Sequence, residues 1–188
     1  MNKEVRRITT EIRSSKEHRI VEGYALLFNT ESRDLGGFTE IISKEAITQD
    51  LIDKADVICW LNHNEDRGIL ARSKEGKGSL LLEIDQIGLK YSFETPNTAL
   101  GEELLENLRR GDITESSFSF VVSTEKWEKR SSGKYLRRIT GFKDIYDVSP
   151  VYKPAYEGTK VTCRSFEEIK NEESEELQEY FNELNKLI

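Results

Sequence analysis

Three serines lie in the stretch ITESSFSFVV, residues 113–122, where β-branched and aromatic residues indicate a buried strand: Ser116, Ser117 and Ser119. A serine hydroxyl becomes a useful nucleophile only when a neighbouring base takes its proton. Because successive side chains of a strand alternate between its two faces, Ser117 and Ser119 share one face and Ser116 lies on the other. Either of the first two could attack a carbonyl group. The alternative is that Ser117 is a strand hydroxyl bonded to a neighbouring strand.

The chain offers two histidines as candidate bases. His18 lies in the charged stretch KEHR, which is typical of a solvated turn. His63 instead follows the apolar run ADVICWL, where a predicted strand enters the polar loop NHNEDRG. Functional groups often project from the end of a strand, because a strand is a rigid support. His63 is therefore the candidate base, although a surface histidine at a strand end is also common.

A histidine base needs a third group that orients the imidazole and stabilises its charged form. The candidates are Asp144 and Asp147 in the stretch DIYDVSPV, and Glu65 and Asp66 next to the histidine. A catalytic triad is defined by its geometry, so the order of these residues along the chain leaves all four possibilities open. An ordinary salt bridge on a strand face is the alternative for Asp147.

The negative charge of this chain of 188 residues is concentrated at one end. The net charge is −7, and residues 166–188, with eight Glu and two Lys, carry −6 of it. The remainder is nearly neutral, so no basic surplus argues for binding to nucleic acid. No apolar run approaches the ~18 residues of a membrane span, and the stretch MNKEVRRITTEIRSS lacks the apolar core of a signal peptide. These features predict a soluble intracellular protein that binds neither nucleic acid nor a membrane.

The two cysteines do not indicate a metal site. Cys59 lies in the apolar run VICWL, which favours a buried thiol over a disulfide, and neither it nor Cys163 belongs to a Cys-x-x-Cys or Cys/His cluster. The sequence therefore predicts no metal and no cofactor.

The patterns along the chain predict an α+β protein with many short strands and a few helices. Strands are expected over residues 19–28, 55–63 and 79–94, the last as two strands joined near residues 86–88. The clearest helix begins near Pro96, carries leucines at helical spacing and ends at Gly111. Further strands follow, with a charged hairpin tip at residues 129–134. We expect two parts: a body over 1–165 and an acidic amphipathic helix over 166–188.

The acidic helix needs a partner surface. Its apolar residues recur at helical spacing and form one stripe: Leu177, Tyr180, Phe181, Leu184, Leu187 and Ile188. The stripe predicts docking on the chain's own body or on a second copy of the chain. A linker that packs against nothing is the alternative, given the charge density.

Five stretches, taken in order, resemble the prohead (procapsid) maturation proteases of tailed bacteriophages. They are EGYALLFNT, FTEIISKEA, VICWLNHNEDRGILAR, GLKYSFETPNTALGEELLENLRRGDITESSFSF and DIYDVSPVYKPAYEGTKV. The family pattern is a strand leading into Asn-His-(Asp/Asn), a Pro-Asn-Thr helix, a Ser-Phe-Gly-Phe strand and a Val-Ser-Pro-Val segment followed by Pro-Ala-Tyr. The resemblance runs from about Val21 to Val161, and it rests on the order of the motifs more than on any one of them.

The resemblance implies a serine endopeptidase that is similar in fold to the herpesvirus assemblin proteases, with a closed, mostly antiparallel β-barrel surrounded by helices. His63 matches the family histidine and Ser117 the serine of Ser-Phe-Gly-Phe. Two residues depart from the pattern, since Ser119 replaces the family glycine and Asp147 replaces the usual glutamate before Val-Ser-Pro-Val. The resemblance therefore implies the catalytic set His63, Ser117 and Asp147, with Ser119 as a second possible nucleophile. Lys153 and the pair Arg137 and Arg138 are possible helpers.

The resemblance also implies partners and a place of action. The substrates would be the phage major capsid protein and a scaffold segment, cleaved in the bacterial host cytoplasm inside the assembling prohead. A homo-oligomer through the C-terminal helix is possible, because the herpesvirus enzymes work as dimers. The main alternative is a catalytically inactive, protease-like domain of a prophage that serves capsid assembly or scaffolding. A generic β-barrel binding module is a further alternative.

Overall fold

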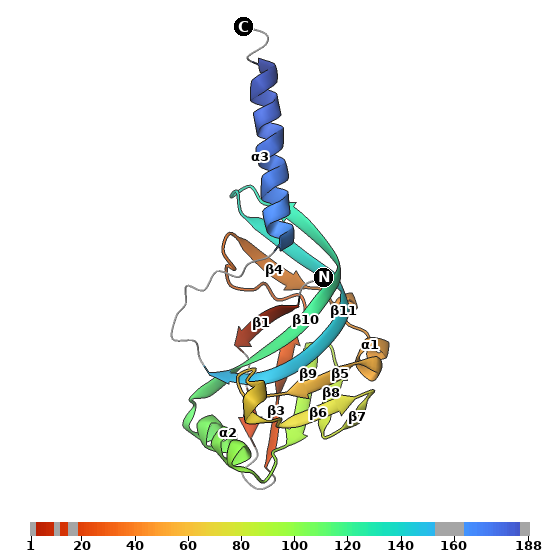
Figure 1. The fold of residues 1–188 in the computed structure, drawn as a ribbon, viewed down its shortest axis with the longest axis vertical. Helices are drawn as coiled ribbons and strands as arrows, with labels where there is room; N and C mark the ends of the chain where they lie inside the picture. Colours follow the sequence, from red (N-terminus) through yellow and green to blue (C-terminus); the bar gives the residue numbers. More distant parts are fainter. Residues whose placement is uncertain (1–2, 10–11, 15–18, 153–163, 185–188) are drawn as a thin grey trace. The chain divides into compact units, whose positions relative to one another are not determined.

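The computed structural model describes residues 3–9, 12–14, 19–152 and 164–184 (Figure 1). The chain divides into two compact units, Met1–Glu157 and Gly158–Ile188. The first unit contains the strands, and the second contains one long helix.

The described part of the first unit is built mainly of strands, as the sequence predicts. The strands are β1 (Glu4–Thr9), β2 (Arg13–Ser14), β3 (Ile20–Leu27), β4 (Phe38–Ile42), β5 (Asp56–Cys59), β6 (Ala71–Lys74), β7 (Lys77–Gly78), β8 (Leu80–Ile84), β9 (Gly88–Glu94), β10 (Ile113–Lys129) and β11 (Tyr135–Tyr152). The helices are α1 (Gln49–Lys54) and α2 (Ala99–Arg110), with the 3₁₀ turns η1 (Lys44–Ala46) and η2 (Glu65–Arg67). The predicted pair of strands over residues 79–94 is confirmed as β8 and β9.

These strands form two sheets, and the expected closed barrel is wrong. One sheet has seven strands, in the order β1-β10-β11-β5-β6-β7, with β4 also paired to β11; the other has the order β2-β3-β9-β8. Within the described residues, β1 and β7 remain the edges of the first sheet, and β2 and β8 those of the second. A barrel requires its edge strands to pair, so the architecture is mixed α+β with two open sheets. The likeness to herpesvirus proteases stays a prediction.

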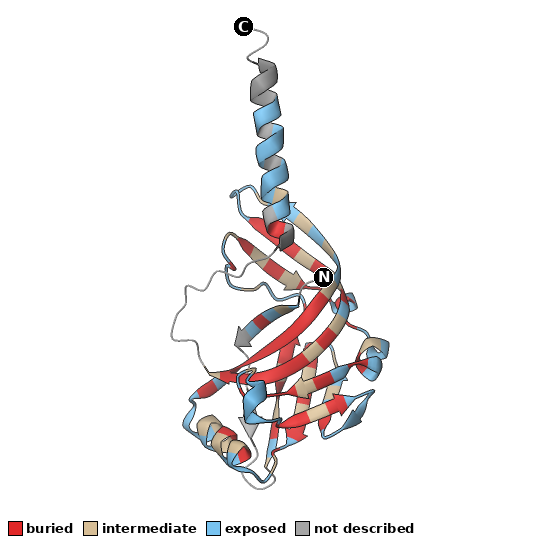
Figure 2. Ribbon diagram, in the orientation of Figure 1, coloured by how far each residue is buried: buried red, intermediate tan, exposed pale blue. Residues whose placement is uncertain are grey.

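The long strands β10 and β11 organise the first sheet. They pair antiparallel with several register shifts, including one between Ser119 and Phe120, and such irregularities bend a strand pair. Because β11 has 18 residues, it pairs in parallel with β4 near its start and with β5 near its end. Figure 2 shows buried positions in the first half of β10 and along most of β11.

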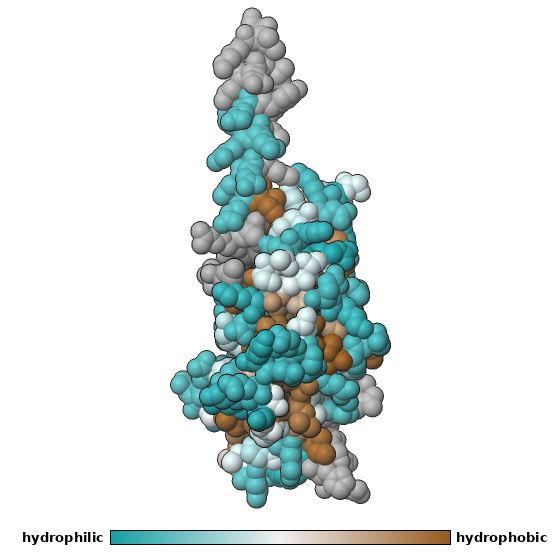
Figure 3. Space-filling model, turned by 90° about the vertical axis from the view of Figure 1, so that its right-hand side faces the viewer, coloured by the Kyte–Doolittle hydropathy of each residue, from teal (hydrophilic) through white to brown (hydrophobic). Residues whose placement is uncertain are grey.

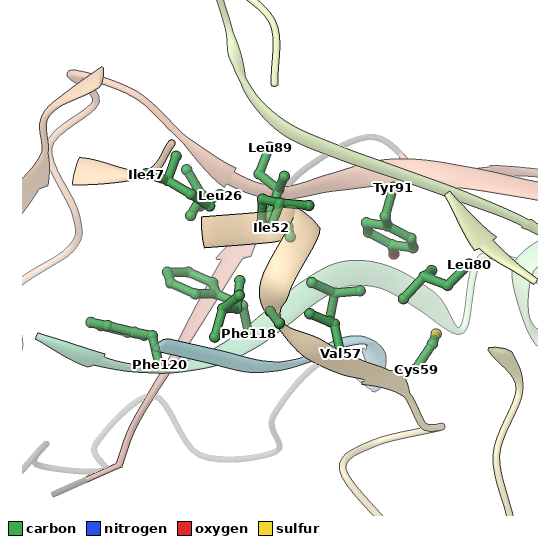
Figure 4. Packing of buried hydrophobic residues seen from close by; sticks show 14 of the residues in the cluster. Leu26, Ile47, Ile52, Val57, Cys59, Leu80, Leu89, Tyr91, Phe118 and Phe120 are labelled. Atoms are coloured by element: carbon green, nitrogen blue, oxygen red, sulfur yellow. The ribbon is translucent and has the colours of Figure 1, made fainter. Parts of the chain in front are cut away.

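The hydrophobic core joins side chains from both sheets. Phe118 and Phe120 of β10 have no exposed surface, and their rings lie 4.9 Å apart. Figure 4 shows them in one cluster with side chains of the other sheet, including Leu26 of β3 and Leu89 of β9. Cys59 belongs to this cluster and has no exposed surface, so its predicted burial is confirmed. Burial raises the pKa of its thiol well above the usual value, and the nearby Asp147 adds to this effect.

The observed helix α2 matches the helix predicted from the sequence except at its first turn. It begins at Ala99, after the N-cap Thr98, whose hydroxyl accepts a hydrogen bond from the Gly101 backbone at 3.3 Å. Since the threonine oxygen satisfies a free N–H group of the first turn, the helix starts there and not at Pro96. The helix ends at Gly111, which has the left-handed conformation (φ 78°) expected of a C-cap glycine.

The second unit contains α3 (Arg164–Leu184), a helix where the sequence predicts one. Its exposed side chains include several glutamates, such as Glu168, Glu172 and Glu176. The side chains that form the predicted apolar stripe lie outside the described set, so docking of this helix stays a prediction. No helix within the described residues is both long enough and apolar enough to cross a membrane.

The surface of the first unit is largely charged. Figure 3 shows one face on which hydrophilic side chains predominate and hydrophobic ones occur in small groups between them. The large hydrophobic side chains that are exposed are scattered among several elements: Val5, Ile20, Ile69, Leu81 and Ile87. Scattered exposed apolar residues are normal for a folded protein and do not by themselves mark an interface.

A buried network of charged residues fastens β1 and β4 to β10 and β11. Arg137 of β11 donates to Glu4 of β1 at 2.6 Å, to Glu40 of β4 at 2.9 Å and to Glu125 of β10 at 2.7 Å. Arg6 of β1 donates to both carboxylate oxygens of Glu40 at 2.9 Å. Burial raises the pKa of Glu4, but Arg137 and Arg6 outweigh it, so the pKa lies below its ordinary value. The network therefore favours the ionised form of Glu4.

We predict that Arg137→Ala destabilises the chain by roughly 3–5 kcal/mol, because it removes the cation shared by Glu4, Glu40 and Glu125 and leaves their charges only partly compensated. The control is Arg130→Ala, which breaks a bidentate ion pair with Glu31 at 2.8 and 2.9 Å. The side chains of this pair are 38% and 37% exposed. An exposed pair of this kind contributes at most about 1 kcal/mol. Urea unfolding of the two variants measures the difference, and equal losses would contradict the assigned role of the network.

Candidate active site

The pairing of β10 with β11 brings four polar side chains to one face of the sheet. Ser117 lies opposite Ser149, and Ser119 lies opposite Asp147. Residues two apart on a strand share a face, and directly paired residues face the same side. Ser116 lies on the other face, where its hydroxyl is 2.9 Å from that of Tyr91 in the core. The predicted separation of Ser116 from Ser117 and Ser119 is confirmed.

His63 reaches this face from the turn that follows β5. Strand β5 pairs in parallel with β11 at Ile58 and Asp147, so the chain leaves β5 beside the acidic residue. Asn62 and His63 both have φ 57°, and two consecutive left-handed residues turn the chain sharply. This conformation is uncommon but is adopted more readily by Asn and His than by most residues. The Asn62 backbone N–H donates to the Pro150 carbonyl at 2.9 Å and fixes the turn against β11.

An exposed ion pair fastens the other end of this loop. Arg67 of η2 donates to Glu103 of α2 at 3.0 Å, and Tyr152 of β11 donates to the same carboxylate at 2.9 Å. The loop is thus fixed on both sides of His63, by β11 before it and by α2 after it. Such support limits the positions that the imidazole can adopt.

The structure brings His63, Ser117 and Asp147 together. The Nε2 atom of His63 lies 2.6 Å from the Ser117 Oγ atom, and its Nδ1 atom lies 2.6 Å from Oδ1 of Asp147. Among the described residues, Nδ1 forms no hydrogen bond of good geometry, so this contact is a close approach and not an aligned hydrogen bond. The order serine, imidazole, carboxylate is that of a serine-protease triad.

Asp147 is almost completely buried and is held by hydroxyl groups. It is 1% exposed, Ser149 donates to its Oδ1 atom at 2.9 Å, and Ser119 donates to Oδ2 at very short range. Burial raises the pKa of Asp147, but His63 beside it and the two hydroxyls outweigh burial, so its pKa lies below the ordinary value. The carboxyl group is therefore ionised at neutral pH.

The other candidate residues lie away from the imidazole. Glu65 and Asp66 are exposed on η2, and Asp144 accepts a hydrogen bond from the Ile145 backbone at 2.8 Å. Arg137 belongs to the buried network described above. Arg138 lies nine residues before Asp147 on β11, where it pairs with Lys126 of β10 and Ile41 of β4, and Lys153 lies outside the described residues. Of the four carboxylates that the sequence left open, Asp147 is the one in contact with His63.

Two contacts of the site were not anticipated from the sequence. One is the hydroxyl of Ser149, which lies in the Val-Ser-Pro-Val stretch two residues after Asp147, so that strand alternation alone could have placed both on one face. The other is the backbone carbonyl of Arg6, which accepts a hydrogen bond from the Ser117 hydroxyl at 2.8 Å. No sequence pattern reports a main-chain contact between residues so far apart.

The chain matches the family model described as "Caudovirus prohead serine protease" over residues 5–172. Among solved structures, it is similar to one titled "Structure of the bacteriophage T4 capsid assembly protease, gp21", with 12% identity and a TM-score of 0.48; the match covers 82% of this chain and 100% of that chain. No curated protein is significantly similar in sequence. Since the family model spans most of the chain, including β10, β11 and the His63 turn, this chain belongs to the caudovirus prohead serine proteases.

Proposed function

We propose that this chain is a serine endopeptidase that uses Ser117 as nucleophile and His63 as base. The observation that carries the proposal is the 2.6 Å distance between His63 Nε2 and Ser117 Oγ. A base and a nucleophile must lie within hydrogen-bond distance for the proton to pass between them. Membership of the prohead serine protease family supports the same reaction class.

The reaction follows from this order of groups. The Ser117 oxygen attacks the carbonyl carbon of a peptide bond while its proton moves to Nε2 of His63. The C–N bond then breaks as the imidazolium returns that proton to the leaving amine, which leaves an acyl group on Ser117. A water molecule, deprotonated by the same imidazole, hydrolyses the ester and restores the serine.

Asp147 stabilises the imidazolium that forms in both halves of the reaction. Its charge lies next to Nδ1 in a buried setting, where an ionic interaction is stronger than in water. The hydroxyls of Ser119 and Ser149 hold the carboxylate in place, and they leave its charge intact because a hydroxyl donates without giving up its proton. Ser119 is thereby assigned to Asp147 and Ser117 to His63.

For the biological role, we propose cleavage of the phage major capsid protein or of a scaffold segment, inside the assembling prohead in the host cytoplasm. Membership of the caudovirus prohead serine proteases supports this assignment. We further propose that residues 1–165 form the protease domain and that residues 166–188 form a helical tail through which copies associate.

The alternative function is a catalytically inactive, protease-like assembly domain. One observation favours it, because Ser117 has no exposed surface in this structure. The short contact between serine and imidazole favours the enzyme, since a domain kept only for scaffolding has no need of an ionised carboxylate beside a histidine and a serine.

We predict that Ser117→Ala abolishes cleavage while the chain still folds. Loss of a triad nucleophile lowers the rate on the order of 10⁴-fold or more. The variant and the wild type are each co-expressed with the major capsid protein of the same phage, and cleavage is followed by intact mass, with circular dichroism as the check on folding.

The matched control for this variant is Ser119→Ala, which removes a hydroxyl two residues away on the same face. It should retain most of the cleavage, because Ser149 still donates to Asp147. Cleavage that persists in Ser117→Ala and disappears in Ser119→Ala would assign the nucleophile to Ser119. Cleavage by both variants would end the proposal.

We predict that Asp147→Asn lowers the rate of cleavage on the order of 10⁴-fold, because an amide provides no charge for the imidazolium and can hold the wrong tautomer. The control is Asp144→Asn, three residues earlier on β11, which should leave the rate unchanged. Steady-state rates on a peptide substrate taken from a mapped cleavage site measure both. Equal rates in the two variants would contradict the role of Asp147.

We predict that Asp147→Asn also changes how the free energy of unfolding depends on pH. A carboxyl group whose pKa is lowered by folding adds stability above its unfolded pKa of about 3.9, and this contribution is lost as the pH falls through the folded pKa. The pKa of Asp147 is lowered. The loss of unfolding free energy in Asp147→Asn should therefore be larger at pH 7 than at pH 3, and a loss that does not depend on pH would show that the charge is not stabilised.

We predict that deletion of residues 167–188 lowers either the number of chain copies that associate in solution or the melting temperature of the chain. Burial of an apolar stripe stabilises the chain by about 25 cal/mol per Å² of apolar surface, whereas an isolated acidic helix is only marginally stable in water. Light scattering and thermal unfolding measure the two effects. A full-length control, Phe181→Glu with Leu184→Glu, disrupts the stripe and should act in the same direction; no change in either variant would show that the helix does not dock.

A further inference from the structure

Strand β1 lies directly against the part of β10 that carries the candidate nucleophile. In the antiparallel register, Arg7 lies opposite Ser117, Arg6 opposite Phe118 and Val5 opposite Ser119. Since β1 is the edge strand of its sheet, it occupies a position next to β10 that a separate extended peptide could also take.

With β1 in this position, Ser117 cannot be reached from solvent. Ser117 and Ser119 have no exposed surface, although the side chain of His63 is 20% exposed. Attack requires a carbonyl carbon to come within about 3–3.5 Å of the serine oxygen. The carbonyl group nearest to that oxygen already belongs to the chain itself, because the Arg6 oxygen lies 2.8 Å from Ser117 Oγ.

The same contact competes for the serine proton. A hydroxyl group has one proton and can donate it to one strong acceptor at a time. In this arrangement the Ser117 hydroxyl donates to the Arg6 carbonyl at 2.8 Å, although Nε2 of His63 lies 2.6 Å away. The base can accept the proton only when this hydrogen bond is broken, so the contact with β1 opposes activation of the serine.

Charged side chains also anchor strand β1. The guanidinium of Arg6 binds both oxygens of Glu40 at 2.9 Å, and Glu4 accepts from Arg137 at 2.6 Å. Just before the strand, the Lys3 ammonium lies 3.7 Å from Oδ2 of Asp147. These contacts set a barrier to separation of β1, but none of them is covalent, and within the described part of the chain β1 pairs with β10 alone.

We propose that β1 occupies the substrate position of this chain and keeps Ser117 latent until it separates from β10. The ligand of the vacated position is an extended peptide segment that pairs with β10 through its main chain, as β1 does, and presents its scissile carbonyl where the Arg6 carbonyl now lies. The inference rests on the proposed function of Ser117 as nucleophile. It explains how a triad with close contacts can coexist with a fully buried serine.

A reversible crosslink between β1 and β10 tests the proposal in the intact chain. Thr9 and Glu115 are paired Cα partners at the far end of the two strands, and the Cα atoms of such pairs lie about 4.5–5.5 Å apart, which suits a disulfide. The variant is Thr9→Cys with Glu115→Cys, in a Cys163→Ser background so that Cys59, which is buried, remains as the other thiol. The reduced form of this variant is the matched control, since it differs from the oxidised form only in the crosslink.

The readout is modification of Ser117 by a fluorophosphonate probe, followed by intact mass and peptide mapping. The serine oxygen forms a bond to phosphorus as fluoride leaves, and the proton passes to His63. We expect the reduced form to be labelled and the oxidised form to be labelled at least tenfold more slowly, with recovery on reduction. As a complement, Arg6→Met loosens the anchor while Glu40 keeps Arg137 as its partner, and labelling should become several-fold faster.

The outcomes separate this proposal from the proposed function. Equal labelling of the oxidised and reduced forms would overturn the latent state and leave the protease assignment intact. Failure of the disulfide to form would contradict the position of β1. If neither form is labelled and the wild-type chain also fails to cleave its capsid protein, the proposed function is wrong and the proposal falls with it.

Discussion

The pairing of β10 with β11 is the constraint on which the site depends. Its register places Ser117 opposite Ser149 and Ser119 opposite Asp147, so one pair of strands supplies the candidate nucleophile, the carboxylate and both hydroxyls that hold the carboxylate. A shift of one residue in this register would turn one strand's side chains to the other face and separate the carboxylate from the serine. The aromatic side chains on the opposite face oppose such a shift, because Phe118 and Phe120 would leave the core.

The local features of the site could be predicted from the sequence, and the long-range ones could not. Strand alternation is enough to place Ser117 with Ser119 and apart from Ser116, because it depends on neighbouring residues only. The choice of Asp147 over Asp144 depends on which of them lies opposite Ser119, and the register shifts of β10 and β11 make this position impossible to count from the sequence. The position of His63 depends on a turn of two left-handed residues that is fixed by the Pro150 carbonyl.

For the fold, too, the local features could be predicted from the sequence and the long-range pairings could not. The strands and helix α2 follow from hydrophobic pattern and capping residues, as Thr98 and Gly111 show. Closure into a barrel is a property of the strands at the edges, and nothing in the pattern of β1, β7, β2 or β8 states which strand each will pair with. The expectation of a barrel came from resemblance to a family and not from these residues. The buried network around Arg137 was also missed, since its members lie on four different strands and each alone resembles a surface charge.

The two residues that depart from the family pattern, Ser119 and Asp147, are hydrogen-bonded to each other. The pattern has glycine where this chain has Ser119, and glutamate where it has Asp147. A shorter carboxylate reaches less far, and a glycine next to it would leave Oδ2 without the donor that the Ser119 hydroxyl supplies. Leaving one oxygen of a buried carboxylate without a hydrogen-bond donor costs about 1–3 kcal/mol or more of folding stability. The Ser119 hydroxyl therefore satisfies Oδ2 of Asp147, while Ser149 donates to Oδ1, the oxygen that lies 2.6 Å from Nδ1 of His63.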